Sequence, residues 1–350
     1  MRILYITKLK NTMANGVTVA VTQLLSSICN YAEIGWLDLG NVDIEVDPKV
    51  KHLQSNDWET FNADIAVFED PFNTLEFCRI AKALRKRNVP YVLTPHGCFT
   101  RVALQKKAIK KYIAIETVFR KYLKDCAATQ FLCKNEQDNS LHYNWSLVIP
   151  NGIPDSNCFR PRTHVRQIVF LSRKDIRHKG IDYLLEAIRI DQDFIRESKA
   201  SIALYGSVES DKDEQYIRDY ISTHHLEDIV SNNGPAFGND KREILNRADA
   251  FVLTSRHEGF PMSILEALSY GLPVLITRGT NLDGIVNEVH AGWTCESNAE
   301  DVACMLHEAI ACDNCASYSK NARELSLRYS WEEVSKMTIG EYQKIVNGRA

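Results

Sequence analysis

The chain has 350 residues and a formal net charge of −3, with 45% hydrophobic and 25% charged residues. This length suits two α/β domains with proper cores better than one. The composition excludes a disordered or fibrous chain, and the charge gives no general case for nucleic-acid binding.

The N-terminal residues 1–7 have no sustained apolar run and no small-residue cleavage site, so they are interpreted as a buried strand rather than a secretory signal. No run of about 18 apolar residues occurs, which predicts no membrane-spanning helix. The 10 cysteines have no framework spacing and are expected to be reduced thiols of a cytoplasmic protein. Cys312 and Cys315 form one C-x-x-C, for which chance spacing beside a helix end is favoured over a zinc or redox role.

Apolar runs of strand length alternate with helix-length segments along the chain. The first half opens with an expected strand at 2–7 and a helix at 17–30, and the second half repeats this with a strand at 167–172 and a helix at 180–190. Further buried strands are expected at 65–68, 91–94, 130–133, 201–205, 250–254 and 273–277. This alternation predicts parallel sheets with right-handed crossovers, hence doubly wound domains.

A domain boundary is expected at residues 150–154, where two prolines and a glycine interrupt the pattern. The polar stretch that follows, to Arg166, is typical of a linker. Because ligands of open parallel sheets bind at the carboxyl ends of the strands, two such domains facing each other predict a site in the cleft that they share.

The segment 253–276 carries the richest set of chemical groups. A strand ends near Thr254, a glycine-containing loop follows, and Pro261 stands where a first helical position is expected. The helix is predicted from Ser263 to Gly271. Its first N–H groups, with Gly259 permitting close approach of the backbone, suit a phosphate or sugar hydroxyls.

Two carboxylates flank this helix start. Glu258 lies in the loop and Glu266 one to two turns into the helix, so the pair can grip different parts of one elongated ligand through its hydroxyls. The alternative is that Glu258 merely complements the helix dipole and that Glu266 is a solvated residue. The apolar neighbours of Glu266 favour the functional interpretation.

Two cations are expected at the mouth of the same site. Arg173 closes a predicted strand and Lys179 precedes Gly180 at a helix start, so both suit a diphosphate leaving group. The alternative is a basic surface loop, because Lys174, Arg177 and His178 are also present.

These segments together resemble glycosyltransferase family 4. Phe170–Ala187 is similar to its Gly-Arg-(variable)-Lys-Gly stretch, and Glu258 with Glu266 is similar to its E-x₇-E signature. Four further segments match in the right order, namely 15–17, 95–97, 148–153 and 329–332. Several spaced motifs make the resemblance more specific than any one of them.

The resemblance implies a GT-B fold, with two Rossmann-like doubly wound parallel-sheet domains facing across a cleft. It implies a retaining transfer from a nucleotide-sugar donor, with no metal and no cofactor besides that co-substrate. Consistently, no Asp-x-Asp stands at a predicted strand end.

The resemblance also implies roles for individual residues. Arg173 and Lys179 would contact the donor diphosphate, Glu266 the ribose, and His96 the sugar and acceptor as a catalytic residue with Glu258. Gly16 would let the first loop close over the phosphates. The donor sugar would be held by Glu258 and the backbone of the next five residues, Gly259, Phe260, Pro261, Met262 and Ser263.

The sequence departs from the family pattern at two places. Ser172 replaces the usual glycine before Arg173, and the first loop has Asn15-Gly16 instead of paired glycines. His96 has a second interpretation as a capped structural histidine beside Gly97, although its place after a strand favours function.

The segment from Arg101 to Lys124 is basic and amphipathic, which suits an anionic membrane surface or simply a solvated face. The resemblance favours membrane docking, because this part of the first domain faces the acceptor side. The docking residues are expected to include Lys106, Lys107, Lys110 and Lys111.

The final segment has helical spacing, and in family members the last helix packs back on the first domain. We therefore predict an acceptor-side domain at 1–153 with the helix at 331–350, and a nucleotide-sugar-binding domain at 154–330.

The predicted function is that of a metal-independent retaining hexosyltransferase in cell-surface polysaccharide or glycolipid biosynthesis. Its partners would be a nucleotide sugar, a saccharide or lipid-linked acceptor and an anionic membrane surface, without nucleic acid. It would be cytoplasmic and peripheral on the inner face of the membrane. The alternatives are a catalytically inactive GT-B nucleotide-binding scaffold and a nucleotide-sugar epimerase.

Overall fold

The computed structural model describes residues 1–10, 16–55, 57–72, 74–105 and 108–348, with the backbone alone at 102 and 108–110. It divides into two compact units, one formed by Met1–Gly152 with Ser330–Ala350 and the other by Ile153–Tyr329. The boundary predicted after residue 153 thus lies one residue from the observed division.

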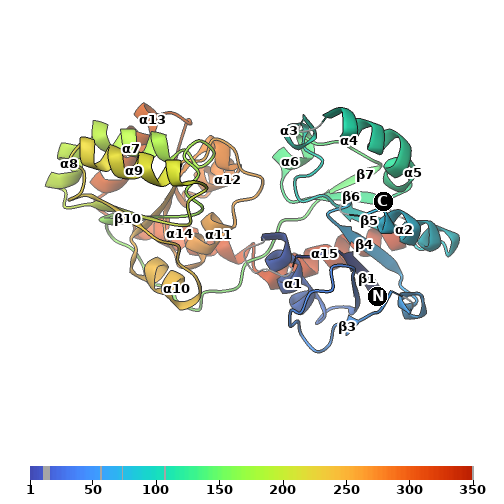
Figure 1. Cartoon of the computed structure of the whole chain (residues 1–350). Helices are drawn as coiled ribbons and strands as arrows, with labels where there is room; N and C mark the ends of the chain where they lie inside the picture. The colour runs from blue at the N-terminus through green and yellow to red at the C-terminus, as the bar shows by residue number, and fades with distance from the viewer. Residues whose placement is uncertain (11–15, 56, 73, 106–107, 349–350) are drawn as a thin grey trace. The chain divides into compact units, whose positions relative to one another are not determined.

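The first unit is built on a seven-stranded parallel sheet with the order β3-β2-β1-β4-β5-β6-β7 (Figure 1). Its strands are β1 (Arg2–Thr7), β2 (Glu33–Asp38), β3 (Lys51–His52), β4 (Ile65–Glu69), β5 (Tyr91–Thr94), β6 (Ala128–Phe131) and β7 (Trp145–Val148). Its helical segments are α1 (Gly16–Ile28), η1 (Trp58–Phe61), α2 (Glu76–Lys86), α3 (Arg101–Gln105), α4 (Ala108–Ala114), η2 (Ile115–Phe119), α5 (Arg120–Lys124), α6 (Lys134–Asp138) and α15 (Trp331–Val346).

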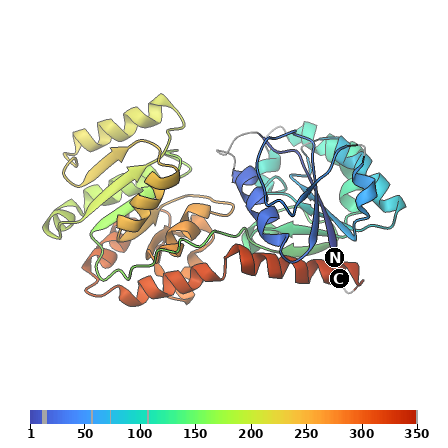
Figure 2. The same cartoon turned by 90° about the horizontal axis from the view of Figure 1, so that it is seen from below.

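Both faces of this sheet are covered, because successive strand residues point to opposite sides. Ile3 and Tyr5 of β1 belong to a core shared with α1 and α15, whereas Leu4 and Ile6 belong to a second core shared with α2 and α5. Figure 2 shows α15 running beneath the first unit as the last helix of the chain. Trp331 Nε1 donates to Gln23 Oε1 of α1 at 3.0 Å, which anchors the start of α15.

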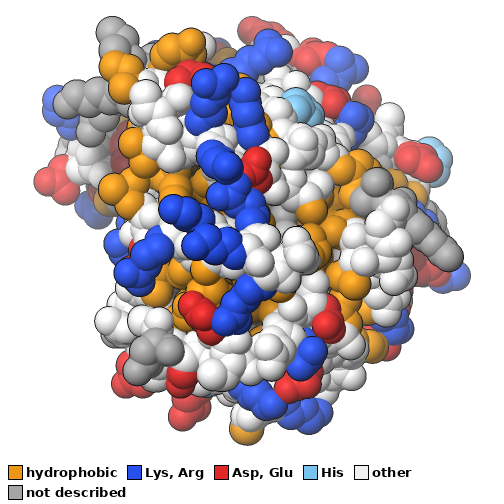
Figure 3. All heavy atoms as spheres, turned by 90° about the vertical axis from the view of Figure 1, so that its right-hand side faces the viewer, with side chains coloured by type: hydrophobic (Ala, Val, Ile, Leu, Met, Phe, Trp, Pro, Cys, Tyr) orange, Lys and Arg blue, Asp and Glu red, His pale blue; other side chains and the backbone are white. Residues whose placement is uncertain are grey.

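The basic stretch of the first unit is helical but not uniform. A π-helical turn, η2, separates α4 from α5, and buries Ile115 and Phe119. Tyr112, Ile113 and Val118 of the same stretch are exposed, at 68%, 56% and 51%. Figure 3 views the molecule from the right-hand side of Figure 1 and shows a band of Lys and Arg side chains among apolar ones.

The second unit contains a six-stranded parallel sheet with the order β10-β9-β8-β11-β12-β13. Its strands are β8 (Gln167–Leu171), β9 (Ser201–Tyr205), β10 (Val230–Asn233), β11 (Ala250–Leu253), β12 (Val274–Thr277) and β13 (Gly292–Cys295). Its helical segments are α7 (Ile181–Ile190), α8 (Gln192–Glu197), α9 (Asp211–Thr223), α10 (Gly238–Arg247), α11 (Met262–Ser269), η3 (Arg278–Thr280), α12 (Asp283–Glu288), α13 (Ala299–Ala311) and α14 (Ala316–Leu327).

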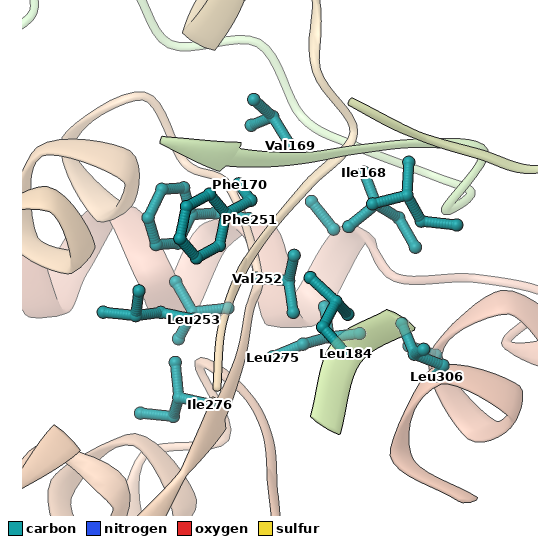
Figure 4. Packing of buried hydrophobic residues seen from close by; sticks show 14 of the residues in the cluster. Ile168, Val169, Phe170, Leu184, Phe251, Val252, Leu253, Leu275, Ile276 and Leu306 are labelled. Atoms are coloured by element: carbon teal, nitrogen blue, oxygen red, sulfur yellow. The ribbon is translucent and has the colours of Figure 1, made fainter. Parts of the chain in front are cut away.

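The core of the second unit lies on both sides of β8, β11 and β12. In Figure 4, Leu184 of α7 and Leu306 of α13 lie beside Val252 and Leu275 of the sheet. The central strands are apolar on both faces, which is typical of parallel sheets covered by helices.

The structure differs from the sequence-based elements in a few places. The strand predicted at 130–133 spans Ala128–Phe131, and α11 begins at Met262 rather than at Pro261. Pro261 has φ −81° and ψ 91°, so it is the extended residue before the helix and the prediction of a first helical position is wrong by one residue. Five strands, β2, β3, β7, β10 and β13, were not predicted.

Within the parts of the chain that the structure describes, no helix combines the length and apolar character needed to cross a bilayer.

Candidate functional site

Each sheet reverses its strand order at one point. In the first unit this switch lies between β1 and β4, and in the second between β8 and β11. Loops that leave adjacent strands in opposite directions open a crevice at such points, which is where doubly wound domains bind ligands. The predicted donor residues follow β8 and β11.

Lys179 is positioned by a turn that requires glycine beside it. Gly180 has φ +65°, and a Cβ there would lie 2.0 Å from the carbonyl oxygen of Thr254. Thr254 Oγ1 in turn donates to the carbonyl oxygens of Gly180 at 2.9 Å and of Lys179 at 3.2 Å. The loop after β8 is therefore packed directly against the end of β11, with Lys179 at the contact.

Glu258 is buried, and both its side chain and its backbone form hydrogen bonds. Lys179 Nζ lies 2.6 Å from its Oε1, and Ser255 Oγ donates to the same oxygen at 2.5 Å. The backbone N–H of Glu258 donates to Gly279 at 2.8 Å, and Asn281 Nδ2 donates to its carbonyl oxygen. The structure thus brings together two of the predicted site residues, Lys179 and Glu258, from different loops.

Arg256 joins the two loops that carry this pair. Its guanidinium forms two bonds with the Asp182 carboxylate, at 2.7 and 2.8 Å, and lies 3.6 Å from the centre of the Tyr183 ring. Its backbone N–H donates to the carbonyl oxygen of His178 at 3.0 Å. Sequence reasoning missed this contact, although Arg256 lies inside the segment that it singled out.

The basic residues after β8 have different environments. Arg173 is about half exposed and pairs with Glu209 at 2.7 Å. Lys174 is buried and its Nζ binds Asn232 Oδ1 at 2.6 Å and Glu214 Oε2 at 3.2 Å. The alternative of a basic surface loop is therefore wrong for Lys174, which links the end of β8 to β10. It holds for Arg177, whose side chain is 85% exposed.

Glu266 faces a cation that the sequence analysis did not identify. Lys241 Nζ of α10 lies 2.6 Å from Glu266 Oε2, and both side chains are under one third exposed. Lys241 and Arg173 line one cavity of about 160 Å³, together with Ser172, Gly206 and Phe237. The cavity lies at the ends of β8 and β9, so two cations line it, and one of them, Lys241, also contacts the Glu266 carboxylate.

The loop from Gly259 to Ser263 leads into α11. Gly259 is exposed and a Cβ there would contact nothing within 4 Å, so the chain itself does not demand glycine. Pro261 is buried, while Phe260, Met262 and Ser263 are half-buried. The first N–H groups of a helix lack partners within it, so the start of α11 suits an acceptor oxygen of a ligand.

His96 follows β5 at the carboxyl edge of the first sheet, in a left-handed backbone conformation. Its φ of +46° is in the left-handed region, as is the φ of +53° at Asp70 after the adjacent strand. His96 Nε2 lies 2.6 Å from Glu69 Oε2, and both side chains are buried. Although burial lowers the pKa of His96, the hydrogen bond and charge of Glu69, with Glu136 nearby, raise it above its ordinary value.

The remaining predicted site residues are Gly16 and the four lysines expected to dock on a membrane. Gly16 is the exposed first residue of α1, and a Cβ there would contact nothing within 4 Å. Lys106 and Lys107 lie outside the described residues, and Lys110 is described by its backbone alone. Lys111 lies in α4 and is half-buried.

The C-x-x-C segment lies between α13 and α14. Cys315 is buried and stands at the start of α14. In the described parts of the chain, no three His, Cys, Asp or Glu side chains gather in a way that could hold a metal ion.

Two doubly wound parallel units in one chain, the second with cations and carboxylates at its switch point, define a protein with the GT-B fold. Residues 159–325 match the family model described as "Glycosyl transferases group 1".

Relatives and solved structures agree with this class. The chain is 24% identical to an uncharacterized glycosyltransferase, MJ1178, of Methanocaldococcus jannaschii, over 73% of this chain and 69% of that protein. It is 23% identical to an MMP alpha-(1->4)-mannosyltransferase of Mycolicibacterium hassiacum, over 70% of this chain and 57% of that protein. The structure of Anabaena HepE in complex with UDP matches with a TM-score of 0.73 and 14% identity, covering 98% of this chain and 100% of that one. The solved structure shows that the chain has the GT-B fold, and the family model and the two relatives support glycosyltransferase activity.

Proposed function

We propose that the chain is a retaining, metal-independent hexosyltransferase that moves a sugar from a nucleotide sugar to a saccharide or lipid-linked acceptor. The observation that carries this proposal is the Lys179–Glu258 pair at 2.6 Å at the switch point of the second unit. This pair supports the proposal because a lysine suits a diphosphate and a carboxylate suits the hydroxyls of a sugar. The match over residues 159–325 covers this pair.

On the donor side, Lys179 and Arg173 bind the diphosphate and stabilise the negative charge that develops as the glycosidic bond breaks. Glu258 and the backbone from Gly259 to Ser263 hold the sugar, with Phe260, Pro261 and Met262 shaping the loop. Glu266 accepts from the ribose hydroxyls. Its contact with Lys241 supports this assignment, because Lys241 lines the cavity of about 160 Å³ together with Arg173.

On the acceptor side, His96 is the catalytic residue that the first unit supplies, and Gly16 permits the loop before α1 to approach the phosphates. Glu69 supports the role of His96, because the hydrogen bond between its carboxylate and His96 Nε2 fixes the orientation of the imidazole ring.

A donor screen tests this function. Purified protein is heated with UDP, GDP, dTDP and CDP and with their sugars in EDTA, because a ligand that binds only the folded state raises the melting temperature. We expect one nucleotide series to stabilise the protein, and Lys179→Ala and Glu266→Ala to lose most of that effect. No shift with any nucleotide, or full activity in both variants, would contradict the assignment and favour the inactive-scaffold alternative.

The stereochemistry needs its own measurement. Transfer from the selected donor is followed by NMR of the anomeric proton in the product. Retention of the donor configuration, unaffected by EDTA, is expected. An inverted product or loss of transfer in EDTA would refute the retaining or the metal-independent part of the proposal.

We further propose that the stretch from Arg101 to Lys124 docks on an anionic membrane surface in the cytoplasm. Its exposed Tyr112, Ile113 and Val118 lie among basic residues, a combination that suits the headgroup region. Such a location would serve polysaccharide or glycolipid assembly with a lipid-linked acceptor.

Vesicle sedimentation tests the docking proposal. A chain with Lys106, Lys107, Lys110 and Lys111 reversed to Glu should lose binding to vesicles containing phosphatidylglycerol, and wild-type binding should weaken with salt. Reversal of Lys320, Lys336 and Lys344, which lie on α14 and α15, is the control. Equal binding by both variants would refute the proposal.

A further inference from the structure

The carboxylate of Glu258 is held in place independently of Lys179. Ser255 donates to its Oε1 at 2.5 Å, and Gly279 and Asn281 bond its backbone. Ser255 is itself fixed, because its carbonyl oxygen accepts from Thr277 Oγ1 at 2.7 Å. Glu258 is therefore part of a rigid loop, and its side chain cannot easily swing away from Lys179.

Lys179 is fixed on the opposite side of the same contact. The Gly180 turn and the two bonds from Thr254 hold its backbone against β11. The side chains of Lys179 and Glu258 are only 12% and 9% exposed. An anion that reaches Lys179 must consequently come close to Glu258, in surroundings where water screens charges weakly.

A nucleotide sugar and a nucleoside diphosphate differ in what they bring to this carboxylate. The nucleotide sugar offers sugar hydroxyls that can donate hydrogen bonds to Glu258, and each of its two phosphate groups carries a single negative charge. The diphosphate offers no such hydroxyls, and its terminal phosphate takes on a second charge with a pKa of about 6. Near neutral pH the Glu258 carboxylate therefore repels the nucleoside diphosphate more strongly than it repels the nucleotide sugar.

We propose that Glu258 makes the site discriminate between the intact nucleotide sugar and its nucleoside diphosphate product. The carboxylate competes with the terminal phosphate for Lys179, so it weakens product binding while it bonds the donor sugar. This inference rests on the proposed function. It assigns Glu258 a role in product release as well as in sugar binding.

Calorimetric titration of Glu258→Gln tests the proposal. The ligands are the nucleoside diphosphate that the thermal screen selects and its nucleotide sugar, at pH 7.5. Glutamine keeps an oxygen acceptor for the sugar hydroxyls but removes the charge. We expect the diphosphate to bind the variant roughly tenfold more tightly, about 1.4 kcal/mol, while affinity for the nucleotide sugar changes by less than about threefold.

The control variant is Glu243→Gln, which removes the same charge from an exposed pair with Arg247 in the second unit. Its affinities should equal those of the wild type. The gain in Glu258→Gln should also persist in high salt, because a buried charge is screened less than an exposed one.

A measurement on the wild-type protein avoids any loss of stability in the variant. The β-methyl ester of the diphosphate has the charge of a nucleotide sugar but none of its sugar hydroxyls. It should bind the wild type more tightly than the free diphosphate does. Weaker binding of the ester, or unchanged or weaker diphosphate binding by Glu258→Gln, overturns the inference while leaving the proposed function intact. A wild-type protein that binds no nucleotide overturns both.

Discussion

Replacing Arg256 by Ala should loosen the donor loops without touching a predicted ligand contact. The guanidinium makes two bonds to Asp182, at 2.7 and 2.8 Å, and one to the carbonyl oxygen of Arg177 at 2.7 Å. It also lies over the Tyr183 ring, 3.6 Å from the centre. All of these contacts join the loop that carries Glu258 to the segment that carries Lys179.

The size of the effect follows from these contacts. A hydrogen bond to a charged group contributes about 1.5–3 kcal/mol, and a cation–π contact at a partly exposed site about 0.5–1 kcal/mol. The Arg256 side chain is 25% exposed, and Asp182 keeps a weaker contact with Arg177 at 3.6 Å, so part of the loss is offset. We expect about 3 kcal/mol of destabilisation, which for a unit of this size lowers Tm by roughly 6–12 °C.

Scanning calorimetry and a double-mutant cycle measure this coupling. Arg256→Ala, Asp182→Ala and the double variant should show non-additive losses, because each single change removes the same interaction. The KM for the donor should rise more than kcat falls, since the Lys179–Glu258 contact is displaced before catalysis begins. A Tm within about 1 °C of the wild type, or strictly additive losses, would refute the reasoning.

Further predictions concern backbone strain, a buried cation and pH. Gly180→Ala should lower the Tm and abolish nucleotide binding, because at φ +65° its Cβ would lie 2.0 Å from the carbonyl oxygen of Thr254. Gly234→Ala is the control, since its Cβ would have no atom within 4 Å, and it should behave as wild type in both assays. Arg162→Ala should lower the free energy of unfolding by about 3 kcal/mol, because the buried guanidinium donates to the carbonyl oxygens of Ala248 and Asn246 at the end of α10, at 2.9 and 3.0 Å. Arg162→Lys should not restore the loss. A decrease below about 1 kcal/mol in thermal unfolding would contradict this prediction. The raised pKa of His96 predicts a stabilising contribution that is complete below its unfolded pKa of about 6.5 and is lost as pH rises through its folded pKa. Glu69→Gln should therefore flatten the pH dependence of the Tm above about pH 6.5, and an unchanged profile would show that the pair does not act in this way.

Much of the architecture follows from local pattern. Residues 65–68 and Ala250–Leu253 are apolar at every position, as expected of strands with helices on both faces. The strands that escaped prediction are mainly those at the sheet edges. β10 (Val230–Asn233) and β3 (Lys51–His52) are polar, because one side of an edge strand is open to water and no continuous apolar run is needed there.

The sequence by itself determined which residue types stand at strand ends and helix starts, and hence Arg173, Lys179, Glu258 and Glu266 as candidates. Only the tertiary structure decided their partners. Lys179 meets Glu258 across 79 residues of chain, and Arg256 meets Asp182 across 74. Lys174 and Arg173 are neighbours in the sequence, yet one is buried against β10 and the other is half exposed. Such partners are set by the order in which parallel strands lie side by side, and that order arises from packing of the whole sheet rather than from any local run of residues.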